Sequence, residues 1–312
     1  MQKSNNTEES LVASEPYISW GGEWTEQKLE AFEKYVKAYL TIMNIHRDKY
    51  GWELVYFDGF AGSGTRGTTV IEEEEVPSLF DVSELEISTS EMDVYSGAAE
   101  RVLRLDKRGF DYYYFNEPDE KSMESLKSKL GELIQDKRVA FRSEDANKEI
   151  IKLANGFKTH KNLKGLVFLD PFGMQVDWNS LKALKGCAVD LWILVPTGVI
   201  INRMLDKKGN LFHTNKLQKF FGLGEDFIKK YFYEEHKEKT IFGDEHHHLK
   251  KIPDAIPRIA QLYIDLLKTI FKEVSDEPLI LRNTRGVPIF HFVFASNNPT
   301  AKKIASQIIG KS

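Results

Sequence analysis

The chain has 312 residues, which corresponds to about two domains, or to one large α/β domain with additions. Hydrophobic residues make up 41% and charged residues 29%, enough for a sizeable buried core, so wholesale disorder is excluded. Forty-three Lys and Arg against 47 Asp and Glu leave a formal charge of −4, which gives nucleic-acid binding no support and allows it only through a local basic groove. The single cysteine, Cys187, excludes an internal disulfide and a multi-cysteine metal site, and it fits a reducing compartment.

The N-terminal segment 1–15 is polar, with few apolar residues and neither the charged start nor the apolar core of a signal peptide. We expect a disordered tail there and one folded domain over 16–312. No apolar run approaches the roughly 20 residues that a membrane-spanning helix needs. These features predict a cytoplasmic protein with no membrane segment.

Between residues 24 and 50, apolar side chains recur every three or four positions, which predicts an amphipathic helix. The nearly continuous apolar run 53–57 predicts a strand buried on both faces, and a glycine-rich turn at 58–64 follows it. The stretch 68–93 has no clear period and contains four consecutive glutamates, so we interpret it as an inserted acidic loop. A helical pattern returns at 96–107.

Strands and helices then alternate. The predicted strands are 112–116, 138–142, 165–169 and 189–195, separated by predicted helices at 120–133, 147–157 and 178–184. Strands that alternate with helices in this way predict a parallel sheet that is covered on both faces.

The order changes after the last of these strands. Residues 200–251 are Lys-rich and aromatic, and we expect a helical subdomain there. An amphipathic helix is predicted at 254–272. Two further strands, 278–282 and 288–295, are joined by so short a link that only antiparallel pairing is possible.

The turn at 58–64 reads Asp-Gly-Phe-Ala-Gly-Ser-Gly. Glycines after a strand let a ligand approach the backbone N–H groups, because no side chain is in the way. Two cofactor classes use such a turn. Residues 62–67 fit the GxGxxG pattern of nicotinamide enzymes, although the first glycine should lie closer to the strand, and 58–64 fit the acid-x-x-x-Gly-x-Gly turn of S-adenosylmethionine enzymes. A tight turn without a ligand is the alternative. The residues expected to bind the cofactor here are Asp58, Gly59, Phe60, Ala61, Gly62 and Gly64.

Two carboxylates at the ends of the next strands extend this predicted site. Glu117 ends the second strand, where a carboxylate can accept hydrogen bonds from both ribose hydroxyls of either cofactor class, so it indicates a nucleoside without naming it. Asp145 ends the third strand, where methyltransferases use a carboxylate to accept the adenine amino group. An N-cap for the following helix is an alternative role for Asp145, and the two roles can coexist.

The most distinctive motif is Asp170-Pro171-Phe172-Gly173, at the end of the fourth strand. Ligands of open α/β sheets bind at this edge. Pro171 needs no partner for a backbone N–H, and Phe172 can offer a ring face to a flat substrate. We expect Asp170, Pro171 and Phe172 to be the catalytic residues, with a purely structural turn as the alternative.

Taken together, these segments resemble the three-Cys-motif partner family, a bacterial group with a methyltransferase-like fold. The resemblance spans about residues 20 to 310. It is carried by Trp24-Thr25 with Lys28-Leu29 and by the segments 57–64, 168–173 and 288–296.

This resemblance implies an α/β, Rossmann-like class I methyltransferase fold: a seven-stranded, mostly parallel sheet with an antiparallel last strand, an N-terminal helix and a helical insertion. It implies S-adenosylmethionine as the cofactor and, from the family's name, a partner protein that bears three cysteines. Asp-Pro-Phe-Gly is also similar to the Asp/Asn-Pro-Pro-aromatic motif of enzymes that methylate exocyclic amino groups of bases, but Phe172 replaces the second proline.

We therefore expect methyl transfer to an amino or amide group of a nucleic-acid or protein acceptor. The main alternative is a non-catalytic binding or assembly partner protein that retains the fold. A nicotinamide oxidoreductase is disfavoured by the closing hairpin and by Asp-Pro-Phe-Gly.

Overall fold

The computed structural model describes residues 18–19, 23–63, 68–69, 97–105, 108–239 and 245–311. Gly64, the expected tail at 1–15 and the expected acidic loop beyond Thr69 lie outside these residues. Two short strands, β1 (Ile18–Ser19) and β3 (Thr68–Thr69), pair antiparallel. Within the described ranges, no helix combines the length and apolar character needed to cross a bilayer.

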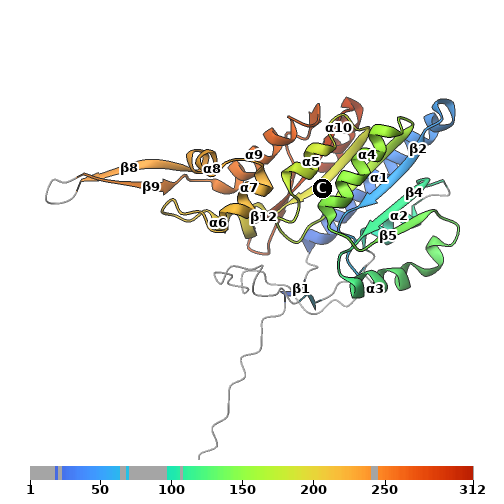
Figure 1. Cartoon of the computed structure of the whole chain (residues 1–312), viewed down its shortest axis with the longest axis horizontal. Helices are drawn as coiled ribbons and strands as arrows, with labels where there is room; N and C mark the ends of the chain where they lie inside the picture. The colour runs from blue at the N-terminus through green and yellow to red at the C-terminus, as the bar shows by residue number, and fades with distance from the viewer. Residues whose placement is uncertain are drawn as a thin grey trace, which may run out of the picture.

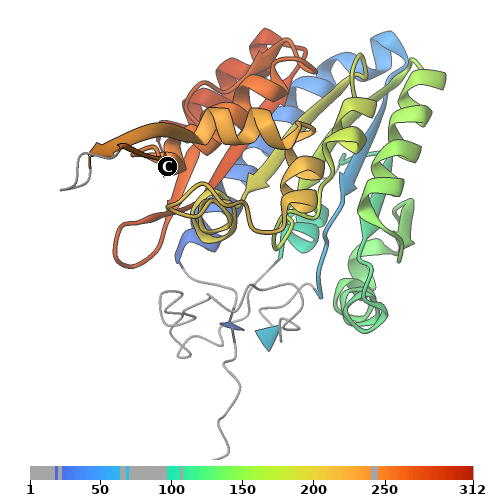
Figure 2. The same ribbon diagram turned by 60° about the vertical axis from the view of Figure 1, so that its left-hand side comes forward.

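An eight-stranded sheet forms the centre of the molecule (Figures 1 and 2). Its parallel strands are β2 (Glu53–Asp58), β4 (Tyr112–Asn116), β5 (Val139–Arg142), β6 (Leu163–Leu169) and β7 (Val189–Val195). Their order in space is β5–β4–β2–β6–β7. The chain therefore adds β4 and β5 on one side of β2 and then crosses back to add β6 and β7 on the other side. Ligands of such sheets bind at the carboxyl ends of the strands where this reversal occurs, here between β2 and β6.

The strand β12 (Pro288–Ser296) is inserted antiparallel beside β7. On its other side it pairs with β11 (Leu279–Arg282) and with β10 (Glu273–Val274), a two-residue strand that the sequence pattern did not predict, so the sheet has eight strands rather than seven. A mostly parallel sheet with an antiparallel strand inserted next to its edge is the Rossmann-like class I methyltransferase fold. The predicted fold class is thus confirmed.

Helices cover both faces of the sheet (Figure 2). On one face pack α1 (Glu23–Tyr50), α2 (Ala98–Arg104), α3 (Glu120–Leu130) and α10 (Pro299–Ile309). On the other face pack α4 (Ala146–Thr159), α5 (Trp178–Ala183), α7 (Thr214–Phe221), α8 (Glu225–Phe232) and α9 (Ala255–Leu267). The 3₁₀ turn η2 (Gly131–Ile134) extends α3. The predicted apolar stripe of α1 is buried against the sheet, for example at Leu29, Phe32 and Val36.

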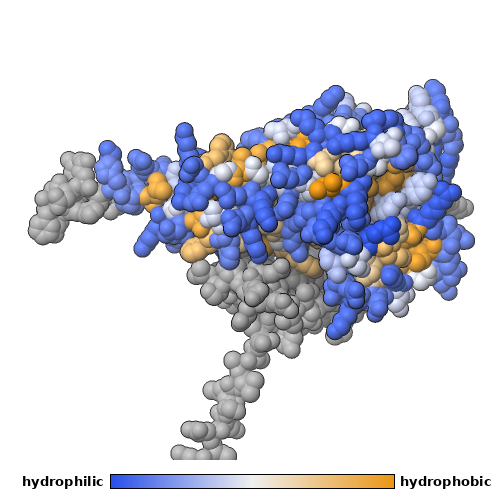
Figure 3. Space-filling view, in the orientation of Figure 1, coloured by the Kyte–Doolittle hydropathy of each residue, from blue (hydrophilic) through white to orange (hydrophobic). Residues whose placement is uncertain are grey.

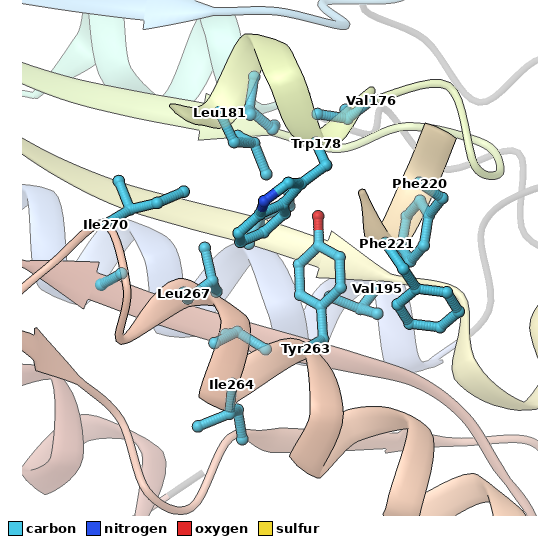
Figure 4. Close-up of a cluster of buried hydrophobic side chains, with 14 of the residues drawn as sticks. Val176, Trp178, Leu181, Val195, Phe220, Phe221, Tyr263, Ile264, Leu267 and Ile270 are labelled. Carbon is cyan, nitrogen blue, oxygen red and sulfur yellow. The ribbon is translucent and has the colours of Figure 1, made fainter. Parts of the chain in front are cut away.

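The second face contains an aromatic-rich core (Figure 4). Trp178 of α5 meets Tyr263 of α9 edge-on, with ring centroids 5.9 Å apart, and Phe220 of α7 stacks on Tyr263 at 4.8 Å. Helix α7 belongs to the segment that follows β7. The helical insertion is therefore packed onto the helices of the sheet and continues the same hydrophobic core.

The segment 200–251, expected to be helical, is helical only as far as Phe232. The π-helical turn η3 (Thr197–Ile201), α6 (Asn202–Met204), α7 and α8 are followed by the antiparallel strands β8 (Tyr233–Lys239) and β9 (Glu245–Lys251). This hairpin projects from the body of the molecule (Figure 1), and its surface is mostly hydrophilic (Figure 3). The prediction of helix was wrong for this part, because beyond Tyr233 the two strands consist almost entirely of Glu, Lys and His and lack the apolar alternation by which strands are recognised.

Candidate functional site

Three carboxylates lie at the carboxyl ends of neighbouring parallel strands. Asp58 ends β2, whereas Glu117 and Asp170 directly follow β4 and β6, the two strands that flank β2. The strand registers place Phe115 and Phe168 beside Asp58. The topology therefore brings together side chains that are far apart in the sequence, and we call Asp58, Glu117 and Asp170 the strand-end carboxylates.

Gly59 begins the turn after β2 and is packed tightly against β6. Its N–H donates to the carbonyl of Phe168 at 3.0 Å. A Cβ at this position would lie 2.6 Å from Cδ2 of Leu169, a distance that real Cβ atoms do not show. Only glycine fits between the two strand ends without displacing the neighbouring side chain.

The rest of the turn is held from the β4 side. The N–H of Ala61 donates to the carbonyl of Asn116 at 2.9 Å, and the N–H of Gly62 donates to Oε2 of Glu117 at 3.0 Å. Gly62 has a φ of +60°, a conformation that suits glycine. Phe60, between Gly59 and Ala61 in the chain, is half-buried. Of the residues predicted from this motif, Asp58 through Gly62 form one fixed turn between β4 and β6.

The carboxyl group of Asp58 is buried and is 1% exposed. It accepts hydrogen bonds from the N–H of Phe60 at 3.2 Å and from the hydroxyl of Tyr56 at 3.3 Å. The pKa of Asp58 is raised to about 8, chiefly by burial; the negative charges of Asp170 and Glu117 contribute to the rise, and the two hydrogen bonds oppose it. At neutral pH most of this carboxyl group therefore keeps its proton, and it anchors the start of the turn.

Glu117 is 8% exposed. Its Oε2 accepts the N–H of Gly62 and its Oε1 accepts the N–H of Asp119, each at 3.0 Å. Burial raises the pKa of Glu117, while these two hydrogen bonds lower it. Since every carboxylate oxygen has two lone pairs, each oxygen can accept one further hydrogen bond, as a ribose diol would require.

At the β5 edge, the side chain of Asp145 accepts the N–H of Lys148 at 3.0 Å and so caps α4, the alternative role foreseen from the sequence. Sequence reasoning missed the fully buried Asn116. Its Nδ2 donates to the carbonyls of Gly59 at 3.2 Å and Glu144 at 3.0 Å, which ties together the turns after β2 and β5.

At the β6 edge, Lys28 of α1 forms an ion pair with Oδ2 of Asp170. The Lys28 side chain is 3% exposed and that of Asp170 is 24% exposed, so the lysine is buried behind a carboxylate that faces outward. Pro171 is buried, and Phe172 is 42% exposed. Lys28 was not predicted as a site residue from its chemistry. The available signal was a charged residue within the buried stripe of α1, next to Leu29.

Beyond β7, Thr197 and His291 form a buried pair, with the threonine Oγ1 2.7 Å from Nδ1 of the histidine. Burial lowers the pKa of His291 to about 4, so the imidazole is neutral at neutral pH. Gly173 lies against η3, where an added Cβ would be 3.1 Å from the side chain of Ile200. These contacts fix the backbone that follows β7 next to the Asp170 motif.

A hollow with a volume of about 470 Å³ lies elsewhere, under α4. Its floor includes Phe57, Tyr112 and Tyr114, and none of the strand-end carboxylates lines it. We place the candidate site at the carboxyl edge of the sheet because the topology and the converging polar groups are found there, whereas the hollow is lined mainly by the apolar faces of β2, β4 and α4.

No protein-family model matches the chain, and no curated protein matches its sequence. Among solved structures, the protein LPL1258 from Legionella pneumophila, described by the family model DUF519, is similar at 16% identity and a TM-score of 0.41, covering 80% of this chain and 93% of that one. An S-adenosylmethionine-dependent methyltransferase from Clostridium acetobutylicum is similar at 8% identity and a TM-score of 0.36, covering 88% of this chain and 92% of that one. At such values neither likeness carries an argument about activity. The resemblance to the three-Cys-motif partner family stays a prediction.

Proposed function

We propose that this protein is an S-adenosylmethionine-dependent methyltransferase that acts on an amino or amide group of a nucleic-acid or protein acceptor. The observation that carries the proposal is the convergence of Asp58, Glu117 and Asp170 around the fixed glycine turn at the switch point of the sheet. A nucleoside would lie over β4 with its ribose on Glu117, and Asp145 stands at the β5 end of the same edge. A nicotinamide cofactor would find the same ribose partner, but it has no use for Asp-Pro-Phe-Gly.

The residues present suit this cofactor. Glu117 is a nearly buried carboxylate with spare acceptor capacity, and there is open space beside Gly62, the turn residue bonded to it, where an added Cβ would meet nothing within 4 Å. The cofactor supplies an activated methyl group on a sulfonium sulfur. The protein must then mainly align the acceptor nitrogen with that methyl group and exclude water.

The residues that follow β6 would align the acceptor nitrogen with the methyl group. When the acceptor nitrogen takes the methyl group, it would lose a proton, which a carboxylate or water would accept. Because Oδ2 of Asp170 is bound by Lys28, Oδ1 and the carbonyl of Pro171 would each accept one N–H of the acceptor. These bonds turn the nitrogen lone pair toward the methyl group. The exposed ring of Phe172 would stack on a flat acceptor, which for a nucleic-acid base means extrusion from any helix.

A non-catalytic binding or assembly role is the second candidate, and one observation favours it. Both carboxylates expected to bind ligands already have partners within the protein: Glu117 binds two backbone N–H groups and Asp170 binds Lys28. A scaffold would retain such internal bonds for stability. Under either function, the partner we propose from the family resemblance is a protein that bears three cysteines.

The test begins with calorimetric titration of the protein with S-adenosylmethionine, S-adenosylhomocysteine and NAD. The proposal expects binding of the first two and not of NAD. Methyl transfer is then measured with tritium-labelled S-adenosylmethionine and fractionated nucleic acid and protein as acceptors. Asp170→Ala and Asp170→Asn should lower turnover roughly 100-fold or more, because acceptor alignment is lost, while donor affinity stays within about threefold.

The two Asp170 variants separate chemistry from folding, since asparagine keeps the shape of the side chain next to Lys28. Turnover at the wild-type rate in both variants would show that Asp170 is not the aligning group. Donor binding without transfer to any fraction would favour the scaffold role. Binding of NAD alone would refute S-adenosylmethionine as the cofactor and support a nicotinamide instead.

A further inference from the structure

Two polar side chains in the first two turns of α1 are buried in a way that packing alone does not explain. Lys28 is 3% exposed and pairs with Asp170. Thr25 is 9% exposed, and its hydroxyl has no hydrogen-bond partner among the described residues. Burying a hydroxyl group without a partner costs free energy, so a ligand that placed an acceptor beside Thr25 would gain a hydrogen bond at little further desolvation cost.

The positions of these residues follow from helix and strand geometry. Phe32 lies on the same face of α1, and its ring is 4.2 Å from that of Phe168, two residues before Asp170. Thr25 is seven residues nearer the N-terminus, or about 10 Å along the helix, which equals about three residues of a strand. Because α1 turns tightly into β2 after Tyr50 and runs back along it, Thr25 lies level with the strand ends. Lys28 reaches the same level with its long side chain.

The two ends of the proposed donor then meet different groups. Its nucleoside would lie at Glu117, after β4, so its amino-acid end must extend across β2 toward β6. That end carries an α-carboxylate. The ammonium of Lys28 lies at the β6 end, and two of its three N–H donors remain after the bond to Asp170.

We propose that Lys28 and Thr25 form the subsite for the α-carboxylate of the methyl donor, an inference that rests on the proposed function. Lys28 shares its ammonium between this carboxylate and Asp170, and the hydroxyl of Thr25 donates to the second carboxylate oxygen. The subsite thereby links the donor to the residue that aligns the acceptor. It also gives the buried hydroxyl of Thr25 its partner.

The test compares two ligands that differ only at the amino-acid end. S-adenosylhomocysteine carries the carboxylate, whereas 5′-methylthioadenosine has the same thioether nucleoside without it. Lys28→Met should weaken the binding of S-adenosylhomocysteine by at least about tenfold, and Thr25→Val by about threefold, as expected for a charged and a neutral hydrogen bond. The affinity for 5′-methylthioadenosine should change less than about twofold in both variants. Calorimetry supplies the affinities.

The controls keep the outcomes apart. Lys34→Met removes an exposed lysine of the same helix, which pairs with Glu30, and should leave both affinities unchanged. Thr25→Val keeps every charge and nearly the same shape, so it remains informative if Lys28→Met folds poorly. In Asp170→Asn, the affinity for S-adenosylhomocysteine relative to that for 5′-methylthioadenosine should not fall. If it falls as much as in Lys28→Met, then Lys28 acts only through Asp170 and the proposal is overturned.

Equal weakening of both ligands in Lys28→Met and Thr25→Val would likewise overturn it, because the effect would not involve the carboxylate. If the wild-type protein binds both nucleosides equally and neither variant alters this, the subsite is refuted while the proposed function stands. If the wild-type protein binds neither nucleoside, the proposed function itself fails.

Discussion

Asp58 shows how one buried group can set a pH dependence for the whole fold. Its pKa is about 8 in the folded protein, chiefly because of burial, against about 3.9 in an unfolded chain. Between these values the folded state holds a proton that the unfolded state has lost. The free energy of unfolding therefore falls as the pH rises from about 4 to about 8.

Replacing Asp58 by Asn should remove this contribution. The amide keeps the shape of the side chain and an acceptor for the N–H of Phe60, but it does not titrate. We expect the wild-type protein to lose more stability than Asp58→Asn between pH 5 and pH 8, as measured by urea unfolding at each pH. Asp190, whose pKa burial raises to about 6, is present in both proteins and cancels in the comparison. Parallel pH profiles for the two proteins would contradict the assignment.

A site residue can be predicted from the sequence when a local pattern marks it, and not when only a distant contact does. Asp58, Glu117 and Asp170 each follow an apolar run, so the end of a strand marks them, and the alternation of strands and helices indicates that these ends share an edge. Lys28 and Asn116 have no such mark. Lys28 pairs with Asp170, 142 residues away, and Asn116 bonds Gly59, 57 residues away, so only the packed structure reveals their partners.

Helix α1 is fixed to the sheet by a polar contact as well as by its apolar stripe. The hydroxyl of Tyr35 donates to Oδ2 of Asp190 in β7 at 2.7 Å, and the hydroxyl of Ser296 in β12 donates to the other oxygen of the same carboxylate. Tyr39, one turn further along α1, is also buried, but its hydroxyl has no hydrogen-bond partner among the described residues. The two tyrosines form a matched pair on one helix.

We expect Tyr35→Phe to lower the free energy of unfolding by about 1 to 3 kcal/mol, because Asp190 then keeps only one of its two side-chain donors in a buried environment. Tyr39→Phe removes a hydroxyl that makes no bond, and we expect a change of no more than about 0.5 kcal/mol, or a gain in stability. Urea denaturation at one pH measures both. A similar loss in the two variants would mean that ring packing, rather than the bond to Asp190, holds α1 in place.

The β8–β9 hairpin was missed because its sequence has no strand pattern. After Tyr233, β8 contains only Glu, Lys and His, residues that carry no apolar alternation, and β9 contributes one apolar residue, Leu249. Glu and Lys are also good helix formers, which made helix the natural expectation. What stabilises the ribbon is pairing across the strands, such as Glu234 opposite Lys250, and this pairing cannot be inferred from either strand alone.

The central sheet, by contrast, was predictable because its constraints act on the whole chain. Buried parallel strands need helical crossovers, and the short link before β12 permits only an antiparallel partner, so the order of elements already restricts the topology. The buried core distinguishes the body of the molecule from the hairpin. The body has a continuous core on each face of the sheet. The described part of the hairpin contacts the body at its root, where Tyr233 is buried and Lys251 donates to the carbonyls of Asn202 and Leu205.

Removing the outer part of the hairpin should therefore leave the body intact. In a variant with residues 236–248 replaced by Asn-Gly, Glu235 and Leu249 stay opposite each other and the root contacts are kept. We expect the free energy of unfolding to change by no more than about 1 kcal/mol, because the removed side chains that the structure describes, His236, Lys237, His247 and His248, are polar and mostly exposed. The affinity for S-adenosylhomocysteine should also be unchanged, since the strand-end carboxylates lie in the body. Urea unfolding and calorimetry measure the two quantities, and a loss of ligand affinity at unchanged stability would show that the hairpin takes part in the candidate site.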